Sequence, residues 1–293
     1  MNNTFNKIKE LSNDPKINHS KAVMHEKMGQ IDKAIDEYKI ASEKGYSKSQ
    51  YALGELYYNM GKYESAEEWY AKAYKNGETD AALDIGNMYS EIEGYEYAVY
   101  WYEKAAKEGN LAAQNNLGVT YFKINDCERS RKWLQEAIKS DFELAYFNLG
   151  ILHNTLGEKD TAMSYYRKGS VRLEENSKYN LAVMLEMNNE DKEAMNLYKY
   201  LFKSGYEKAC FNLGLIMEKQ GYLEEAERYY SKGANKKHIK SKFRLGCIAE
   251  QQNEIEEAKD YYLECIQEDF KLAKFTIANL YNKENDMQNA KEY

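Results

Sequence analysis

Proline is almost absent from this sequence, since Pro15 is the only one among 293 residues. Proline breaks helix interiors because its ring removes a backbone donor and clashes with the preceding turn. Alanine, leucine, glutamate and lysine, which favour helices, are common. The composition therefore predicts an all-α chain whose helices are joined by short connections.

Cysteine is scarce, and long apolar runs are missing. Cys127, Cys210, Cys247 and Cys265 form no CxxC pair and have no histidine at ligand spacing. We expect reduced, partly buried thiols, with neither a disulfide framework nor a metal site. No segment approaches the length that crosses a membrane, and the first ten residues contain no apolar run. These absences predict a soluble, cytoplasmic protein without a membrane partner.

An excess of positive charge is also missing. The formal net charge is −7 and the isoelectric point is about 5.4. Nucleic acid and anionic lipid are held by broad basic surfaces. The charge balance therefore disfavours both ligands and favours a protein or peptide partner.

What the sequence does contain is a repeat of 32 residues without insertions. One small residue recurs at this spacing, at Ala22, Gly54, Gly86, Gly118, Gly150, Ala182, Gly214, Gly246 and Ala278. A second recurs twelve positions later, at Ala34, Ala66, Ala98, Ser130, Ala162, Ala194, Ala226, Ala258 and Ala290. Fixed periods of this length are typical of solenoids. The sequence predicts an α-solenoid of about nine helix-turn-helix repeats.

Within each repeat, two amphipathic stretches flank a tight turn. In residues 47–78, apolar and small side chains keep three- and four-residue spacing in both stretches, which places them on one face of each helix. Glycine or asparagine occupies the turn in every repeat but one, where Glu93 is followed by Gly94. Both residue types tolerate the left-handed conformation that ends a helix. Each repeat is predicted to be a helical hairpin.

Tyrosine recurs at one position of the second helix, at Tyr38, Tyr70, Tyr102, Tyr166, Tyr198, Tyr230 and Tyr262. Aromatic residues at helical spacing beside small residues are typical of a packed core. We therefore interpret these rings as architectural, and no cofactor is predicted.

Two segments carry a family resemblance: AQNNLGVTYFKINDCERSRKWLQEA and ACFNLGLIMEKQGYLEEAERYYSKG. Both resemble the tetratricopeptide repeat and its Sel-one-like relatives, and the resemblance covers roughly residues 15–293. The period of 32 is shorter than the family's usual 34, and the family's proline near the end of each unit is missing. The resemblance implies right-handed superhelical stacking, with first helices lining the concave surface.

The two ends of the array differ. Asp14 and Pro15 are typical of a helix N-cap and first helical position, so we expect an N-terminal arm or cap over residues 1–14 and the solenoid over 15–293. The ninth repeat stops at Tyr293, inside its second helix. An incomplete last repeat leaves open a contact of the C-terminal end with a second copy or with another protein.

Asparagine occupies one first-helix position in four consecutive repeats, at Asn116, Asn148, Asn180 and Asn212. If this position faces the concave groove, as the resemblance implies, the amides form a row that binds an extended peptide backbone. The alternative is hydrogen bonding to the neighbouring helix. Four hydrogen bonds contribute about 2–6 kcal/mol against the ~8 kcal/mol of micromolar affinity, so a ligand needs additional contacts.

Those contacts are predicted at one end of the row. Lys208 and Lys240 each stand four residues before Asn212 and Arg244, so each pair lies on one helix face. Together they loosely resemble the carboxylate clamp of some tetratricopeptide domains, which implies a peptide carboxylate as the guest of Arg244. A solvated basic face is the alternative, because residues 232–244 are rich in lysine.

An aromatic row stands next to the asparagines, at Phe147, Tyr179, Phe211, Phe243 and Phe275. It forms either a wall of the groove or packing between helices, and packing is the favoured interpretation.

Nothing in the sequence points to catalysis. His153 replaces a tyrosine of neighbouring repeats, and we interpret it as a packing histidine. The sequence has no HExxH, glycine-rich phosphate loop, nucleophile elbow or paired ligand set. We predict no enzyme, no catalytic residue and no metal.

The sequence therefore predicts a non-catalytic adaptor that binds a partner peptide or protein segment in its concave groove. One alternative is a regulatory or inhibitory subunit that docks on a folded enzyme or nuclease through its convex face or ends. A second is contact with nucleic acid or phosphate through the basic segment 232–244, for which steep salt dependence is the test.

Overall fold

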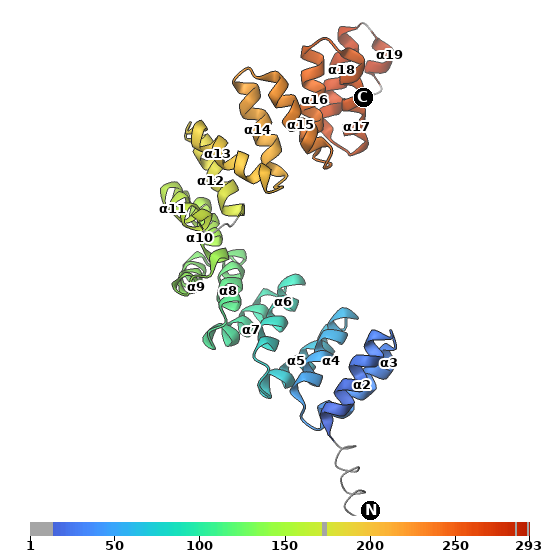
Figure 1. Cartoon of the computed structure of the whole chain (residues 1–293), viewed down its shortest axis with the longest axis vertical. Coiled ribbons are helices and arrows are strands. Elements are labelled where there is room, and N and C mark those ends of the chain that lie inside the picture. Colours follow the sequence, from blue (N-terminus) through green and yellow to red (C-terminus); the bar gives the residue numbers. More distant parts are fainter. Residues whose placement is uncertain (1–13, 172–174, 285, 292) are drawn as a thin grey trace, which may run out of the picture. The chain divides into compact units, whose positions relative to one another are not determined.

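The computed structural model describes residues 14–171, 175–284, 286–291 and 293, and every regular element within these ranges is an α-helix (Figure 1). The prediction of an all-α chain is confirmed. Most of the expected N-terminal arm, residues 1–13, lies outside the described residues. Asp14 accepts a hydrogen bond from the backbone nitrogen of Lys16 at 2.9 Å and caps the first described helix, which begins at Pro15.

Helices alternate between two roles along the chain. The first helices of successive repeats are α2 (Pro15–Lys27), α4 (Ser47–Asn59), α6 (Asp80–Glu91), α8 (Leu111–Lys123), α10 (Glu143–Thr155), α12 (Glu175–Met187), α14 (Lys208–Lys219), α16 (Ile239–Gln251) and α18 (Lys271–Lys283). The second helices are α3 (Ile31–Glu43), α5 (Tyr63–Lys75), α7 (Tyr95–Lys107), α9 (Cys127–Lys139), α11 (Lys159–Val171), α13 (Asp191–Lys203), α15 (Leu223–Ala234), α17 (Ile255–Gln267) and α19 (Met287–Ala290).

The chain divides into two compact units, one up to Glu158 and one from Lys159 onward. Within each unit, a second helix packs on its own first helix and on the first helix that follows, as α5 does on α4 and α6. Consecutive hairpins therefore stack into the predicted α-solenoid. The boundary lies in the turn between α10 and α11, which the sequence period does not distinguish from other turns.

Left-handed residues end the helices, as the turn positions predicted. Asn125 and Asn253 have φ values of 62° and 65°, and several glycines occupy the same region. In the exceptional repeat, Glu93 itself takes φ 60°, whereas Gly94 has φ −76° and serves as the N-cap of α7. Gly94 therefore does not adopt the left-handed conformation in place of Glu93. This conformation destabilises the fold by about 1–2 kcal/mol at a residue such as glutamate.

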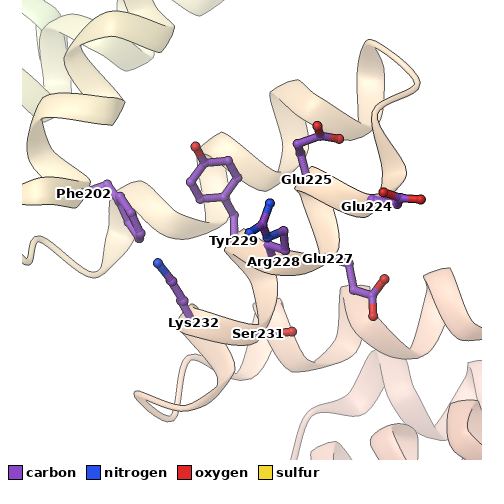
Figure 2. Close-up of a pocket in the computed structure, with 8 residues that line it drawn as sticks. All are labelled: Phe202, Glu224, Glu225, Glu227, Arg228, Tyr229, Ser231 and Lys232. Atoms are coloured by element: carbon purple, nitrogen blue, oxygen red, sulfur yellow. The ribbon is translucent and has the colours of Figure 1, made fainter.

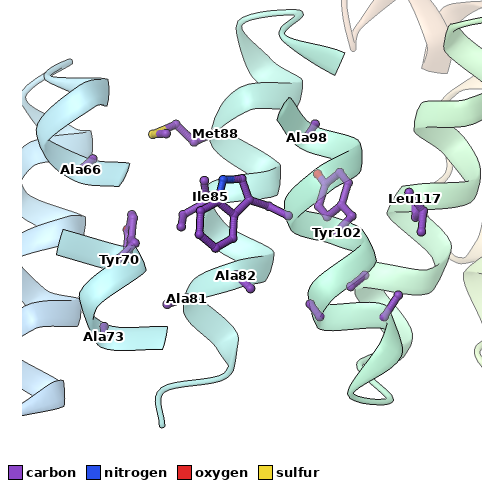
Figure 3. Packing of buried hydrophobic residues seen from close by; sticks show 14 of the residues in the cluster. Ala66, Tyr70, Ala73, Ala81, Ala82, Ile85, Met88, Ala98, Tyr102 and Leu117 are labelled. Carbon is purple, nitrogen blue, oxygen red and sulfur yellow. The ribbon is translucent and has the colours of Figure 1, made fainter. Parts of the chain in front are cut away.

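Small residues of the first helices pack directly against large residues of the second helices. A Cβ atom built on Gly214 would lie 2.3 Å from Cε1 of Tyr230, and one on Gly86 would lie 2.4 Å from Cδ1 of Tyr102. Tyr102 and Tyr230 are almost fully buried. Figure 3 shows Tyr102 among the alanine and leucine side chains of the N-terminal unit. The architectural interpretation of the repeated tyrosines is confirmed.

Within the described ranges, no helix combines the length and the apolar character that spanning a bilayer requires.

Candidate functional site

A pocket of about 740 Å³ opens on the first helices of the C-terminal unit. Three successive first helices, α12, α14 and α16, contribute its walls, together with the residue that precedes α16. We call it the first-helix pocket, and its lining residues are Tyr179, Val183, Glu186, Met187, Lys208, Phe211, Asn212, Lys219, His238 and Lys240. Several of these residues stand 32 positions apart in the sequence, so the repeat itself aligns them.

Two lysines give the pocket a positive charge. Lys208 is the first residue of α14 and Lys240 is the second residue of α16, and both side chains are exposed. Among the described residues, no carboxylate oxygen lies within 4 Å of either ammonium group. Neither helix has an acidic residue in its first turn. Because the N-terminal end of a helix is electropositive, lysines there destabilise the helix by about 0.3–1 kcal/mol each and strengthen the local attraction for anions.

The other charged groups of the pocket are engaged. Lys219 lies 3.3 Å from the carboxylate of Asp191. Glu186 accepts a hydrogen bond of 3.2 Å from the hydroxyl of Tyr198. The Tyr198 hydroxyl is neutral, so Glu186 keeps its negative charge, but the two positive charges of Lys208 and Lys240 outweigh it and leave the pocket positive.

Asn212 is held rigidly at the base of the pocket. It is buried, and its amide nitrogen donates to the hydroxyls of Tyr198 at 2.7 Å and of Tyr179 at 3.3 Å. Both hydrogen bonds cross to neighbouring helices, α13 and α12. Asn212 thus positions two tyrosine hydroxyls as well as itself.

His238 forms the remaining polar wall. Its Nδ1 atom lies 3.3 Å from the backbone nitrogen of Ser241 and accepts its hydrogen bond, which caps α16. Its ring centroid lies 5.2 Å from that of Phe211. Burial, and secondarily the charge of Lys240, lower the pKa of His238 below its ordinary value. The imidazole is therefore mainly neutral at pH 7.

The structure brings together some of the residues that the sequence singled out. Lys208, Asn212 and Lys240 line the first-helix pocket, as do Tyr179 and Phe211 from the aromatic row.

The remaining asparagines of the row use their amide nitrogens inside the protein. In the N-terminal unit, Asn116 donates to Asn87 at 3.0 Å and Asn148 donates to Asn115 at 2.7 Å. In the C-terminal unit, Asn180 donates to the hydroxyl of Tyr166 at 3.2 Å. Their contact with a peptide remains a prediction.

Arg244 is engaged by a carboxylate rather than open to the pocket. Its Nε atom donates to Glu218 at 3.1 Å, and Nη2 donates to the other oxygen of the same carboxylate. Tyr230 donates to Glu218 as well. The two-point guanidinium contact that was expected for a ligand is thus made within the protein.

Three rings of the aromatic row pack between helices, whereas Phe275 is exposed. Tyr179, Phe211 and Phe243 each have ring centroids within about 6 Å of two other aromatic rings. Phe243 is buried, and Phe147 belongs to the other unit. Only Tyr179 and Phe211 combine packing with a place in the pocket wall.

Part of the basic segment 232–244 is neutralised internally. Lys236 lies 3.6 Å from Glu207, and Lys242 lies 3.1 Å from Glu264 and 3.0 Å from Glu268.

A second pocket, of about 580 Å³, lies on the second helices α13 and α15 of the same unit (Figure 2). Its wall includes Phe202 and Tyr229, whose ring centroids are 5.3 Å apart. The ammonium group of Lys232 points toward Phe202 and lies 4.6 Å from its ring centroid. We call it the second-helix pocket.

The described residues contain no group of three or more metal-ligating side chains. His153 is buried, and its Nδ1 atom lies 2.5 Å from Oε2 of Glu158. Burial raises the pKa of Cys210, Cys247 and Cys265, so these cysteines are thiols at neutral pH.

The sequence did not predict the other five residues that line the pocket, which are Val183, Glu186, Met187, Lys219 and His238. Met187 and Lys219 stand 32 residues apart, so a comparison of corresponding positions in the repeats would have found both of them, whereas Glu186 has no such counterpart in the pocket. His238 belongs to the connection before α16, where the helix period gives no signal.

Comparison with known protein families identifies the repeat in several segments of the chain. Family models described as tetratricopeptide repeat match residues 22–81, 110–140, 143–169, 207–234 and 239–271. A search of curated proteins finds no match.

Solved structures share the fold. A Sel1 repeat protein from Oxalobacter formigenes is 20% identical, with a TM-score of 0.76 over 94% of this chain and 89% of that chain. The c5321 protein, a protective antigen of uropathogenic Escherichia coli with an SLR fold, is 24% identical, with a TM-score of 0.68 over 94% of this chain and 66% of that one. A repeat protein from Parabacteroides merdae is 16% identical, with a TM-score of 0.52 over 75% and 92% of the two chains.

Proposed function

This chain belongs to the tetratricopeptide repeat family, whose members generally serve as scaffolds for protein interactions, and we propose that it binds an acidic segment of a partner protein in the first-helix pocket. The chain has no chemistry of its own in this proposal. Its role is to hold a polypeptide segment that carries carboxylates, either as acidic side chains or as a C-terminus.

The observation that carries the proposal is the placement of Lys208 and Lys240. Both stand at electropositive helix ends, where they lower helix stability, and neither ammonium has a carboxylate partner among the described residues. A bound carboxylate offsets this unfavourable arrangement. Lysines that lower helix stability in the free protein, and that have no carboxylate partner in the described part of the chain, favour a role in binding.

The energies are consistent with moderate affinity. Hydrogen bonds to charged groups contribute about 1.5–3 kcal/mol each, so two lysines supply roughly 3–6 kcal/mol. Micromolar binding requires about 8 kcal/mol. Contacts with Tyr179, Phe211 and Met187, which line the same pocket, supply the apolar remainder.

The test is a titration of the folded chain with a fluorescein-labelled, glutamate-rich peptide that has a free C-terminal carboxylate. Lys208→Ala and Lys240→Ala are each expected to weaken binding about tenfold, and the double variant more. Lys199→Ala removes an exposed lysine of α13 that lies outside the pocket and is the matched control. Circular dichroism checks that each variant is folded.

Altered peptides show whether the pocket binds the C-terminal carboxylate or the acidic side chains. An amidated C-terminus that weakens binding identifies the terminal carboxylate as the guest, whereas replacement of glutamate by glutamine identifies the side chains. Unchanged affinity in the lysine double variant would contradict the proposal.

The second-helix pocket supports the alternative of a regulatory subunit that docks on a folded enzyme. Phe202 and Tyr229 give this surface an apolar wall, and Glu224, Glu225 and Arg228 surround it. A partner captured equally by the wild type and by the lysine double variant, but lost with Tyr229→Ala, would favour this function.

Nucleic-acid or phosphate binding by residues 232–244 has less support, because Lys236, Lys242 and Arg244 are paired with carboxylates.

Contact with a second copy through the C-terminal end rests on α18, where Leu272 and Phe275 are exposed and line a pocket of about 640 Å³. Light scattering measures the molar mass of the wild type and of Phe275→Ser, and so tests whether two copies associate through this surface.

A further inference from the structure

Three aromatic side chains surround one lysine on the second helices of the N-terminal unit. The ammonium nitrogen of Lys104 lies 4.4 Å from the ring centroid of Tyr100, 4.6 Å from that of Trp101 and 5.7 Å from that of Tyr74. Tyr74 belongs to α5, and the other three residues belong to α7. All three distances are within the range of a cation–π interaction. We call these rings the aromatic cage.

The rings have the mutual orientation of cage walls. Trp101 and Tyr100 are inclined at 82° with centroids 5.3 Å apart, and Trp101 and Tyr74 are inclined at 89° with centroids 6.1 Å apart. Trp101 is buried and forms the floor, whereas Tyr100 is 54% exposed and forms an outer wall. A cation between perpendicular rings meets the negative faces of several rings at once.

Carboxylates make the rings better cation ligands. The indole nitrogen of Trp101 donates to Glu67 at 3.1 Å, and the hydroxyl of Tyr74 donates to Glu108. Hydrogen bonding to Glu108, ahead of burial, raises the pKa of Tyr74 to about 12. Donation toward a carboxylate shifts electron density into the ring, which strengthens its attraction for a cation.

Lys104 is held by the rings rather than by an ion pair. Among the described residues, no carboxylate oxygen lies within 4 Å of its ammonium group. By contrast, Lys107, on the same helix, lies 3.1 Å from Glu103. The long, flexible lysine side chain leaves the cage at a cost of only a few weak contacts.

We propose that the aromatic cage is a binding site for an N-methylated lysine side chain of a partner polypeptide, and that Lys104 occupies the site until the partner displaces it. Methylated ammonium groups are less strongly hydrated than that of lysine, so the exchange favours the methylated guest. The site is independent of the first-helix pocket, since it belongs to the other unit and to second helices.

The charge around the cage selects a polypeptide over a choline headgroup. Glu67 and Glu108 hydrogen-bond to the cage. These carboxylates repel the phosphate that accompanies choline in a lipid, and they attract the other basic residues of a lysine-rich segment.

The test follows the indole N–H resonance of Trp101 in the ¹⁵N-labelled full chain, assigned with Trp101→Phe. The probe is a short lysine-containing peptide with a trimethylated lysine, compared with the unmethylated peptide and with an isostere that has a neutral carbon in place of the charged nitrogen. Phosphocholine is the fourth probe. Lys104→Ala opens the cage, Tyr100→Leu removes an exposed wall, and Lys107→Ala is the matched control.

We expect the trimethylated peptide to shift the resonance and to bind Lys104→Ala about fivefold more tightly than the wild type, which corresponds to about 1 kcal/mol. Tyr100→Leu loses this binding, and Lys107→Ala binds like the wild type. Equal binding of the neutral isostere, or no gain in Lys104→Ala, would overturn the cation site. Tighter binding of phosphocholine than of the peptide would overturn the assignment to a polypeptide.

Discussion

The hydroxyl of Tyr230 donates a hydrogen bond of 2.8 Å to Oε2 of Glu218, twelve residues earlier in the chain. The same bond recurs between the two helices of other hairpins, in the pairs Tyr38 and Glu26, Tyr198 and Glu186, and Tyr262 and Glu250. Each tyrosine ring is buried, so its hydroxyl needs a partner near the surface. The repeated tyrosine therefore joins the helices of a hairpin through both packing and a hydrogen bond to a carboxylate.

Removal of one such hydroxyl tests its contribution to stability. Tyr230→Phe leaves the ring packing in place but takes one donor from Glu218, so we expect the free energy of unfolding to fall by about 1.5–3 kcal/mol, as for hydrogen bonds to charged groups. Urea denaturation measures the change. Tyr222→Phe, which alters an exposed ring, is the control and leaves stability unchanged. Equal effects of the two substitutions would show that the bond to Glu218 contributes nothing.

The close contact between Gly214 and Tyr230 predicts that even one added methyl group is harmful. Gly214→Ala places a Cβ atom 2.3–2.7 Å from three atoms of a fully buried ring. Overpacking costs about 1–3 kcal/mol, and the higher helix propensity of alanine returns up to ~1 kcal/mol. We expect a net loss of about 1–2 kcal/mol in thermal or urea unfolding. A stabilised variant would mean that the ring moves aside freely.

Asp84 is predicted to lower stability at neutral pH. Burial, and secondarily the charge of Asp80, raise the pKa of Asp84, although Tyr51 donates a hydrogen bond of 2.5 Å to it. Because its pKa is higher in the folded than in the unfolded state, the ionised carboxylate destabilises the fold above that pKa, and the effect vanishes below the unfolded value.

Asp84→Asn is therefore expected to be more stable than the wild type near pH 7 and equal to it near about pH 3. Urea denaturation at several pH values measures the difference. Asp36→Asn, on the exposed side of α3, is the control. A stabilisation that persists unchanged at acidic pH would assign the effect to packing rather than to charge.

The first-helix pocket predicts that the affinity for an acidic peptide depends on pH. His238 has a lowered pKa in the free protein, mainly through burial. A bound carboxylate favours the imidazolium and raises that pKa, so binding takes up a proton, at the cost of the hydrogen bond that Nδ1 accepts from Ser241. Affinity for the glutamate-rich peptide should rise as pH falls from about 7 to about 5.5, around the ordinary histidine value.

His238→Asn keeps a side-chain acceptor for the N-cap of α16 and removes the titrating group. Its affinity for the peptide should not change over the same pH range in fluorescence anisotropy. The same rise in the variant and the wild type would place the titrating group elsewhere.

Periodicity was sufficient to predict the helical hairpins and the close packing of small residues against tyrosines. Gly214 and Tyr230 are sixteen residues apart within one hairpin, and a tight turn leaves two amphipathic helices little freedom in how they pair. The positions of Lys208, Asn212 and Lys240 on one face followed from helical spacing for the same reason. The contacts within one hairpin can therefore be predicted from the spacing of apolar and small residues along the sequence.

Contacts between repeats depended on the tertiary structure. Arg244 was predicted to face a ligand, yet its guanidinium binds Glu218 on the preceding first helix. The cage around Lys104 likewise needs Tyr74 from a different hairpin than Trp101. Such pairs form only at a particular offset and rotation between neighbouring hairpins. That offset arises from the packing of many side chains at once, so no single spacing in the sequence encodes it.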